Sequence, residues 1–423
     1  MQALLSSFAL LLFAAPVSAQ PVAPPAGTWA QIRNTAIYPV MPAEAKSTST
    51  PGGQPELWNP ADVFAYSGGD LVTLNGVLGF LYWGGGHAAT PDMSLYFAPF
   101  DSSGPRRLTG PYLAPDKVYK YDDPQEVYRS ISRNAPPTVT VAAVPKSRHT
   151  YSSLVSIDIG GKPHLFCFGG SLYTGAGGGT IATRIFDLSL TYEQAMARPD
   201  MGWELKAQAP AGATSSASGW DPKTGLIVTR GRNFWGAYNP RTNAWTRWGD
   251  AWGGSDFEAS VAMDIEGRRM WVLGDRLAEV VNLDTRQVTS LGSWSPDPVD
   301  PNHRPGTVTL RSGKTWPRLF ILPAWKGGYG TGPGLQWHPG RKRLIAWVRG
   351  QNLLQIDPET DKTELLAMSG VTIAKRPEIS TYGRFRLMPN DPDLVVLATQ
   401  VQLDVYIGRL PATGTPLPGP TKP

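Results

Sequence analysis

A unit of four short β-strands recurs along this chain and is clearest from Thr214 onward. There, turns separate four segments with the apolar or alternating pattern of strands: TSSASGWDP, GLIVTRGR, FWGAYNP and AWTRWGD. The next unit reads SVAMDI, RRMWVLGD, AEVVNLD and QVTSLG, and another reads PGLQWHP, RLIAWVRG, NLLQIDP and TELLAM. Asn239 and Asn282 end the third strands of two successive units, 43 residues apart. A four-stranded repeat of this length predicts an all-β protein, a β-propeller in which each unit forms one blade.

Six units can be identified in all. Two units with longer loops precede Thr214, beginning at FAYSGGDLV and at HTYSSLVSID, and a last one begins at YGRFRLMP. Residues 294–332 include GTVTL and RLFILPAW but fit no unit, so they predict either an inserted hairpin or a degenerate seventh blade. We therefore expect six or seven four-stranded blades, with a further insertion near residues 110–146.

The last unit lacks a clear fourth strand, and the N-terminal region contains a candidate for it. GTWAQIRN, around Trp29, resembles the fourth strands GWELKAQ and AWTRWGD, which carry tryptophan near the strand start. Pairing this segment into the last blade would close the ring and remove exposed sheet edges. We expect the propeller to span residues 20–410 and to be closed by this N-terminal strand.

Both ends of the chain have a composition of their own. Residues 1–19 contain an apolar segment from Leu4 to Ala15 followed by VSA, which predicts a secretory signal peptide cleaved after Ala19. The protein is thus expected to be secreted or periplasmic. Residues 411–423, PATGTPLPGPTKP, are rich in proline and glycine and predict a disordered tail. The sole cysteine, Cys167, permits no internal disulfide, so packing must hold the fold together.

The charge and motif content exclude several classes of function. The net charge is +5 without a long Lys/Arg run, which argues against a nucleic-acid partner. No second long apolar segment indicates a membrane span. No zinc, calcium or nucleotide-binding motif occurs, so we predict no metal and no cofactor. We expect a monomer whose partner is an acidic polysaccharide or another anionic ligand.

The glycine-rich second strands, the aromatic positions and the unit length resemble those of the kelch and galactose oxidase-like β-propeller superfamily. This resemblance covers most of the chain after residue 20 and implies the propeller fold. The copper chemistry of galactose oxidase, as the family implies it, needs a Cys–Tyr cross-link, and Cys167 lies in the middle of a strand. A copper radical oxidase is therefore disfavoured.

Propeller topology assigns the histidines to two faces. Consecutive strands A to D of a blade reverse direction, so the B–C loops and the links from D to the next A share one face. His87, in the loop after YWGGG, and His149, in the link RHTYSS, both fall on this face. His164 begins a B strand and His338 ends an A strand, so both belong to the opposite face. Other B–C loops on the first face carry arginines: Arg232, Arg276 and Arg349.

GGGH and RHTY also resemble parts of secreted propeller polysaccharide lyases, such as those acting on ulvan or rhamnose–glucuronate chains, which use His, Tyr and Arg at the mouth of the ring. β-Elimination needs a base, an acid for the leaving oxygen and a cation beside the uronate carboxylate. The resemblance implies catalytic roles for His87, His149 and Tyr151. Arg148 is the substrate-binding candidate beside them, and the loop arginines Arg232, Arg276 and Arg349 could bind carboxylates.

Two alternatives remain open from the sequence. The histidines could shape the loops, the arginines could form salt bridges between blades, and Tyr151 could pack within a strand. The whole protein could instead be a non-catalytic kelch-like module that binds a carbohydrate or a protein, or a bacterial surface or matrix protein with no small ligand. Clustering of His87, His149, Tyr151 and an arginine in one cleft would favour the enzyme.

Overall fold

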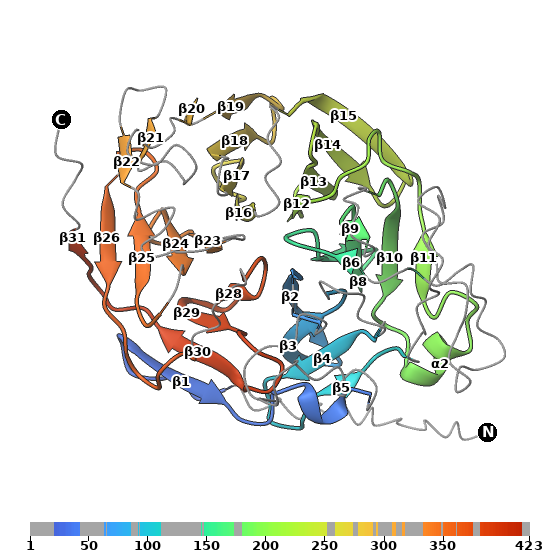
Figure 1. The fold of residues 1–423 in the computed structure, drawn as a ribbon, viewed down its shortest axis with the longest axis horizontal. Helices are drawn as coiled ribbons and strands as arrows, with labels where there is room; N and C mark the ends of the chain where they lie inside the picture. Colours follow the sequence, from blue (N-terminus) through green and yellow to red (C-terminus); the bar gives the residue numbers. More distant parts are fainter. Residues whose placement is uncertain are drawn as a thin grey trace, which may run out of the picture.

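A computed structural model of the chain is an all-β ring of six four-stranded antiparallel sheets (Figure 1). It describes residues 21–42, 63–85, 92–110, 145–172, 180–251, 259–273, 278–290, 333–347, 350–374 and 381–416, apart from single positions or pairs within them, and three short strands between 293 and 317. The β-propeller prediction is confirmed, with six blades. The predicted signal peptide, 1–19, and most of the insertion near 110–146 (residues 111–144) lie outside the described residues.

Each blade is a meander whose strands follow one another from the axis (strand A) to the rim (strand D). Blade 1 comprises β2 (Gly69–Leu74), β3 (Val77–Tyr82), β4 (Tyr96–Pro99) and β5 (Arg106–Arg107), and blade 2 comprises β7 (Val155–Ile159), β8 (Lys162–Phe168), β10 (Thr183–Asp187) and β11 (Trp203–Leu205). Blade 3 comprises β12 (Ala217–Asp221), β13 (Leu226–Arg230), β14 (Phe234–Asn239) and β15 (Ala244–Asp250), and blade 4 comprises β16 (Ser260–Asp264), β17 (Arg269–Leu273), β18 (Ala278–Asn282) and β19 (Val288–Ser290). Blade 5 comprises β23 (Gly334–His338), β24 (Arg343–Trp347), β25 (Leu353–Ile356) and β26 (Thr363–Leu366), and blade 6 comprises β28 (Phe385–Met388), β29 (Asp391–Leu397), β30 (Val405–Arg409) and β1 (Thr28–Ile32).

The N-terminal strand closes the ring as predicted. β1 runs antiparallel to β30, from Thr28 opposite Arg409 to Ile32 opposite Val405. Trp29 is 2% exposed, and its Nε1 donates to the Gln351 carbonyl at 2.8 Å. A side chain at Gly408 would collide with the Trp29 ring, so the glycine leaves room for the indole. One tryptophan thus joins the last blade to blade 5.

Two regions outside the six blades contain further strands. In the 294–332 region, β20 (Ser293–Trp294), β21 (Thr307–Thr309) and β22 (Thr315–Pro317) form a small three-stranded antiparallel sheet instead of a seventh four-stranded blade. The tail predicted to be disordered contains β31 (Thr415–Pro416), which pairs antiparallel with β26 at the rim of blade 5. β27 (Ser369–Gly370) adds in parallel to the outer edge of β1.

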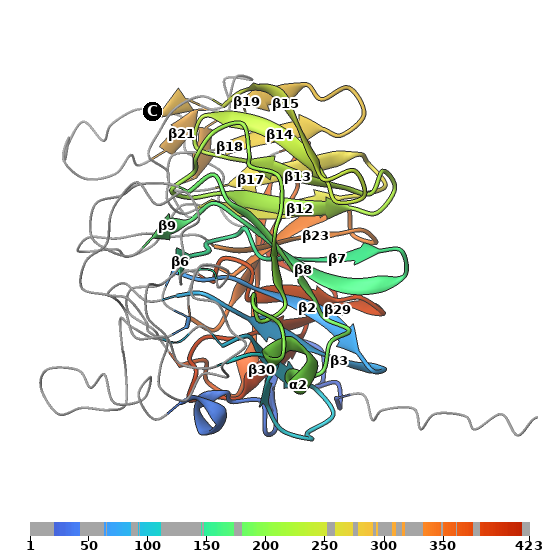
Figure 2. The same cartoon turned by 90° about the vertical axis from the view of Figure 1, so that its right-hand side faces the viewer.

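Short elements decorate the ring. The 3-10 helix η1 (Tyr38–Val40) follows β1, and α2 (Tyr192–Met196) lies between β10 and β11. Thr191 and Gln194 form a capping box at the start of α2, with Gln194 N donating to Thr191 Oγ1 at 3.2 Å. β6 (Arg148–His149) and β9 (Ser171–Leu172) form a two-stranded sheet. Figure 2 shows β6 and β9 on one side of the ring and the β7–β8 hairpin on the other.

These two sides are named here the β6–β9 face and the hairpin face. The β6–β9 face carries the B–C loops and the D–A links, and the hairpin face carries the A–B turns. His164 in β8 and His338 at the end of β23 belong to the hairpin face, as predicted.

The core lies between neighbouring blades. Val228 and Trp235 of blade 3, for example, pack with Val261, Met270 and Val272 of blade 4. Full burial of a large apolar side chain contributes about 1.5–3 kcal/mol, so these layers supply the main stabilisation of a chain without disulfides.

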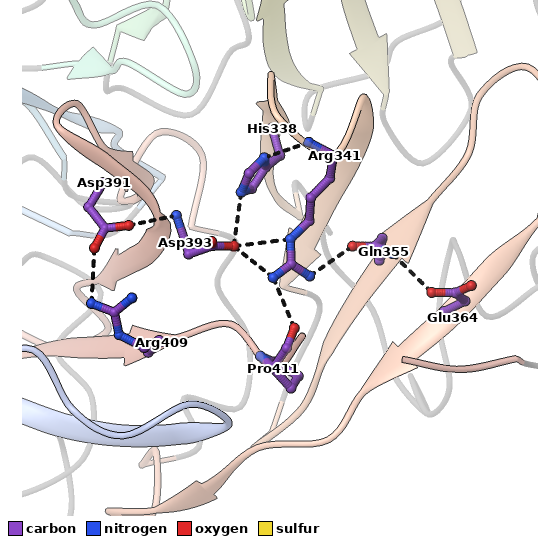
Figure 3. Close-up of polar contacts among 8 residues, drawn as sticks. All are labelled: His338, Arg341, Gln355, Glu364, Asp391, Asp393, Arg409 and Pro411. Carbon is purple, nitrogen blue, oxygen red and sulfur yellow. Dashed lines mark hydrogen bonds and ion pairs between the residues drawn. The ribbon is translucent and has the colours of Figure 1, made fainter. Parts of the chain in front are cut away.

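Polar contacts also join adjacent blades. Arg341, in the A–B turn of blade 5, donates to Asp393 of β29 at 2.6 Å and to the Pro411 carbonyl at 2.9 Å (Figure 3). His338 Nε2 lies 3.2 Å from the same Asp393 carboxylate. This network connects blades 5 and 6 on the hairpin face, so the role of His338 is structural.

Candidate functional site

The two sequence motifs singled out above meet on the β6–β9 face. Gly85 N donates to the Arg148 carbonyl at 2.8 Å, so the glycine-rich end of β3 contacts the RHTY segment. Gly84 has a φ of +93°, and a Cβ there would lie 2.6 Å from Thr150 Cγ2. Only glycine satisfies both the left-handed backbone and the close approach. His87 itself lies outside the described residues.

A cluster of aromatic rings surrounds His149. His149 Nδ1 and Tyr151 Oη are 3.1 Å apart, which is hydrogen-bonding distance. The ring of Tyr66 stacks on His149 with centroids 4.5 Å apart and an interplanar angle of 25°. Tyr382 contacts Tyr151 edge to face at 5.4 Å. Tyr66, His149, Tyr151 and Tyr382 form what we name the tyrosine–histidine cluster.

The three tyrosines share an uncommon backbone conformation. Tyr66, Tyr151 and Tyr382 have φ values of 55°, 46° and 44°, and each precedes strand A of its blade. A non-glycine residue held in this region costs on the order of 1–3 kcal/mol and is frequent at functional sites. A tyrosine in the left-handed conformation therefore precedes strand A in three consecutive blades: 6, 1 and 2.

Close packing of the three D–A links holds these conformations. Tyr151 N donates to the Tyr66 carbonyl at 3.0 Å, and Ser152 Oγ donates to the Tyr382 carbonyl at 3.4 Å. A Cβ on Gly68 would lie 2.4 Å from the Tyr151 carbonyl oxygen. The links thus touch backbone to backbone, which fixes the four rings of the cluster relative to one another.

The end of the His87-bearing loop is anchored by a buried carboxyl group. Asp92 Oδ1 accepts from Ser94 N at 2.9 Å, and Asp92 Oδ2 accepts the hydroxyl of Tyr96. Burial raises the pKa of Asp92 more than these hydrogen bonds lower it. Burial also raises the pKa of the Tyr96 phenol, so Tyr96 remains a hydrogen-bond donor at neutral pH.

The predicted substrate-binding arginines have different environments. Arg148 is 0% exposed; its Nη1 donates to the Gly169 carbonyl at 3.4 Å and its guanidinium lies 5.9 Å from the Trp83 ring centroid. It therefore supports the loop backbone. Arg232, in the B–C loop of blade 3, is exposed. Arg276 and Arg349 lie outside the described residues.

Tyr66 is the site residue that the sequence argument missed. Its signal is a parallel between AYSGG, TYSS and TYGR, in each of which tyrosine precedes a small residue before strand A. Tyr382 lies in the D–A link before β28, so propeller topology places it on the same face. The sequence did not indicate that either ring would contact Tyr151.

The arrangement suits proton transfer. A phenol and an imidazole in contact can pass a proton between them. The four rings are 2–9% exposed, so little ring surface is open to a ligand. Within the described residues, no group of three or more His, Cys, Asp or Glu side chains could hold a metal ion.

Comparisons with known proteins show a likeness of structure only. No known protein family matches the chain, and no curated protein matches it. One solved structure that matches is described as "Crystal Structure of Mitotic Checkpoint Complex"; it is 12% identical, with 96% of this chain and 99% of that chain covered and a TM-score of 0.38. Because this TM-score is low, the fold is assigned from the strand pairing of the chain itself. Among the described residues, no helix is both long and apolar enough to cross a membrane.

Proposed function

We propose that the β6–β9 face binds a uronate-containing polysaccharide and cleaves it by β-elimination. The observation that carries the proposal is the 3.1 Å contact between His149 Nδ1 and Tyr151 Oη inside the tyrosine–histidine cluster. It supports the sequence expectation that a base and an acid share one face. A polysaccharide substrate also agrees with export of the protein, which we propose from residues 1–19.

The proposed reaction uses the pair as a unit. Tyr151 Oη takes the proton from the carbon beside the uronate carboxylate while its own proton passes to His149 Nδ1. The electrons of the broken C–H bond form a carbon–carbon double bond, and the bond to the leaving oxygen breaks. His149 then gives a proton from Nε2 to that oxygen, which leaves the imidazole neutral with the proton on Nδ1.

A carboxylate beside the reacting carbon needs a cation as negative charge develops. Arg232 is the exposed arginine among the described candidates, on the B–C loop of blade 3. An exposed guanidinium can bind a carboxylate in bidentate fashion. We assign this contact to Arg232.

The test is formation of an unsaturated product. The purified chain is incubated with a panel of uronate-containing polysaccharides, and ultraviolet absorbance is recorded. Tyr151→Phe is expected to lower the rate at least about 100-fold, because it removes the acid–base group. Tyr192→Phe, on the exposed side of α2, is the matched control and should leave the rate unchanged. No absorbance change across the panel, or an active Tyr151→Phe variant, would contradict the lyase.

A second candidate, binding without cleavage, is favoured by the burial of the pair. His149 is 9% exposed and Tyr151 is 4% exposed, so little of either side chain faces a ligand at the surface. In this case calorimetry would detect polysaccharide binding while absorbance stayed flat. Arg232→Ala would then weaken binding more at low salt than at high salt, because salt screens exposed charge pairs.

A further inference from the structure

A second site lies on the axis of the ring, away from the tyrosine–histidine cluster. A pocket of about 300 Å³ is lined by strand A residues from all six blades. One lining residue from each blade, in order, is Asp70, Ser156, Trp220, Met263, Gln336 and Arg386. From this geometry we propose that the axial pocket binds a single neutral sugar or a polyol of similar size.

The charges on the pocket wall are already matched. Arg386 Nε lies 2.8 Å from Asp70 Oδ1, and Ser156 N donates to Asp70 Oδ2 at 2.6 Å. The side chains of the ion pair are 14% and 15% exposed, so part of each remains accessible. A charged ligand would compete with this pair, whereas a hydroxyl group can donate to the carboxylate and accept from the guanidinium together. A neutral, hydroxyl-rich ligand therefore fits the wall.

The hydroxyl group of Ser156, on the pocket wall, is buried and lacks a hydrogen-bond partner within the described part of the chain. A buried hydroxyl left without a bond costs on the order of 1–3 kcal/mol, and in native proteins such groups are normally satisfied by water or ligand. A ligand hydroxyl at this position would satisfy it.

The other side of the pocket is apolar. Trp220 supplies an indole, and Met263 lies so close to Gly219 that a Cβ there would be 2.3 Å from its sulfur. Indole rings suit the C–H faces of sugars, and methionine adapts to the shape of a ligand. The pocket volume equals that of about ten water molecules, and this number is close to the count of heavy atoms in one hexose. It lies at the small end of the range for ligand pockets.

The pocket is separate from the β6–β9 face. Its lining residues come mainly from strands A, whereas the four residues of the tyrosine–histidine cluster precede those strands and do not line the pocket. Pro389, in the A–B turn of blade 6, also lines the pocket, so it extends toward the hairpin face. The proposal therefore does not rest on the lyase, and variants on the two faces distinguish the two sites.

The test is ligand-observed saturation-transfer NMR on the full chain with neutral hexoses, inositol and glucuronate at millimolar concentration. We expect saturation transfer to at least one neutral compound. Ser156→Ala removes only the hydroxyl and should weaken binding about three- to tenfold, whereas Ser156→Leu fills the pocket and should abolish it. Tyr192→Phe, on the exposed side of α2, is the matched control and should bind normally, whereas Tyr151→Phe reports any binding on the β6–β9 face. Thermal melting confirms that each variant is folded.

Four outcomes would overturn the proposal. In the first, no neutral sugar or polyol binds. In the second, binding survives Ser156→Leu in a folded protein. In the third, binding is lost in Tyr151→Phe but kept in Ser156→Ala, which would locate the sugar on the β6–β9 face. In the last, glucuronate binds more tightly than the matching neutral hexose, which would mean that Arg386 is available to an anion.

Discussion

Two equivalent turn residues allow the contribution of an inter-blade ion pair to be tested; Arg268 also contacts Asp284 of its own blade at 2.9 Å, but that carboxylate is 56% exposed and such pairs contribute little. Arg268 and Lys342 occupy the same position in the A–B turns of blades 4 and 5, with φ values of 54° and 52°. Each donates its backbone N–H three residues back, to Ile265 and Pro339. The equivalent residue in blade 3 is Gly225, with a φ of +69°. Glycine is therefore compatible with this turn.

The side chains at this position differ in what they contact. Arg268 donates two hydrogen bonds of 2.8 Å to Asp221 of blade 3, and the two side chains are 9% and 1% exposed. Burial raises the pKa of Asp221, but the hydrogen bonds from Arg268 and Thr224 outweigh it, so the pKa lies below its usual range. Lys342 is exposed. Replacing each residue by glycine changes the backbone in the same way but removes the buried ion pair only at 268.

The magnitudes follow from these environments. Relief of the left-handed conformation contributes about 1–2 kcal/mol, and the added freedom of glycine in the unfolded chain offsets about 0.5–1 kcal/mol of it. Lys342→Gly should thus stabilise the protein by about 0.5–1 kcal/mol. Arg268→Gly leaves Asp221 buried without its cation, which costs about 3–5 kcal/mol. Its net effect should be a loss of about 2–4 kcal/mol.

Urea unfolding followed by tryptophan fluorescence measures both variants, because urea leaves ion pairs unscreened. With an unchanged slope, the shift in midpoint gives the change in the free energy of unfolding. Amide exchange in β12 and β17 should accelerate in Arg268→Gly alone. Free energies of unfolding that agree within about 0.5 kcal/mol between the two variants would refute the view that the Asp221–Arg268 pair holds blades 3 and 4 together.

Two further predictions concern ring closure and pH. Trp29→Ala should lower the free energy of unfolding by about 3–5 kcal/mol, because it leaves a cavity between blades 5 and 6. If urea unfolding shows that this free energy falls by less than about 1 kcal/mol, β1 is not needed for closure of the ring. Burial lowers the pKa of His338 below 6.5; the charge of Asp393 opposes this shift and that of Arg341 adds to it. The stability linked to His338 is therefore fully present above the unfolded-state pKa of about 6.5, and it is lost as pH falls below that value. His338→Asn, which retains an acceptor for Arg341 N, should show a smaller drop in urea midpoint between pH 7.5 and 5.5 than the unaltered protein, and equal drops would contradict this assignment.

The fold was predictable because each blade repeats a pattern with its own turns. The Trp29 segment could be placed from its likeness to two other fourth strands, and β1 pairs as expected. The tail was less predictable, because Thr415–Pro416 pair with an edge strand through the backbone, which leaves no side-chain pattern. Proline is tolerated at such an edge, so composition alone did not exclude a strand there.

The site was predictable to the level of a face but not of contacts. Strand alternation placed His149 and Tyr151 together with the glycine-rich loop, and the Gly85–Arg148 hydrogen bond supports that placement. Whether an arginine is buried or exposed depends on the tertiary neighbours that it meets. Arg148 lies over Trp83 while Arg232 is open to solvent, and nothing in the local sequence separates these two environments.

The tyrosines of the cluster combine backbone strain with buried rings. Each left-handed tyrosine costs on the order of 1–3 kcal/mol, which glycine would avoid. Aromatic contacts such as Tyr66 on His149 and Tyr151 on Tyr382 return about 0.5–1.5 kcal/mol each. Burial of the three tyrosine rings, which are 2–9% exposed, adds about 1.5–3 kcal/mol each to these contacts, so packing offsets the backbone strain. Glycine would lack both this packing and the phenol beside His149, on which the proposed acid–base pair depends.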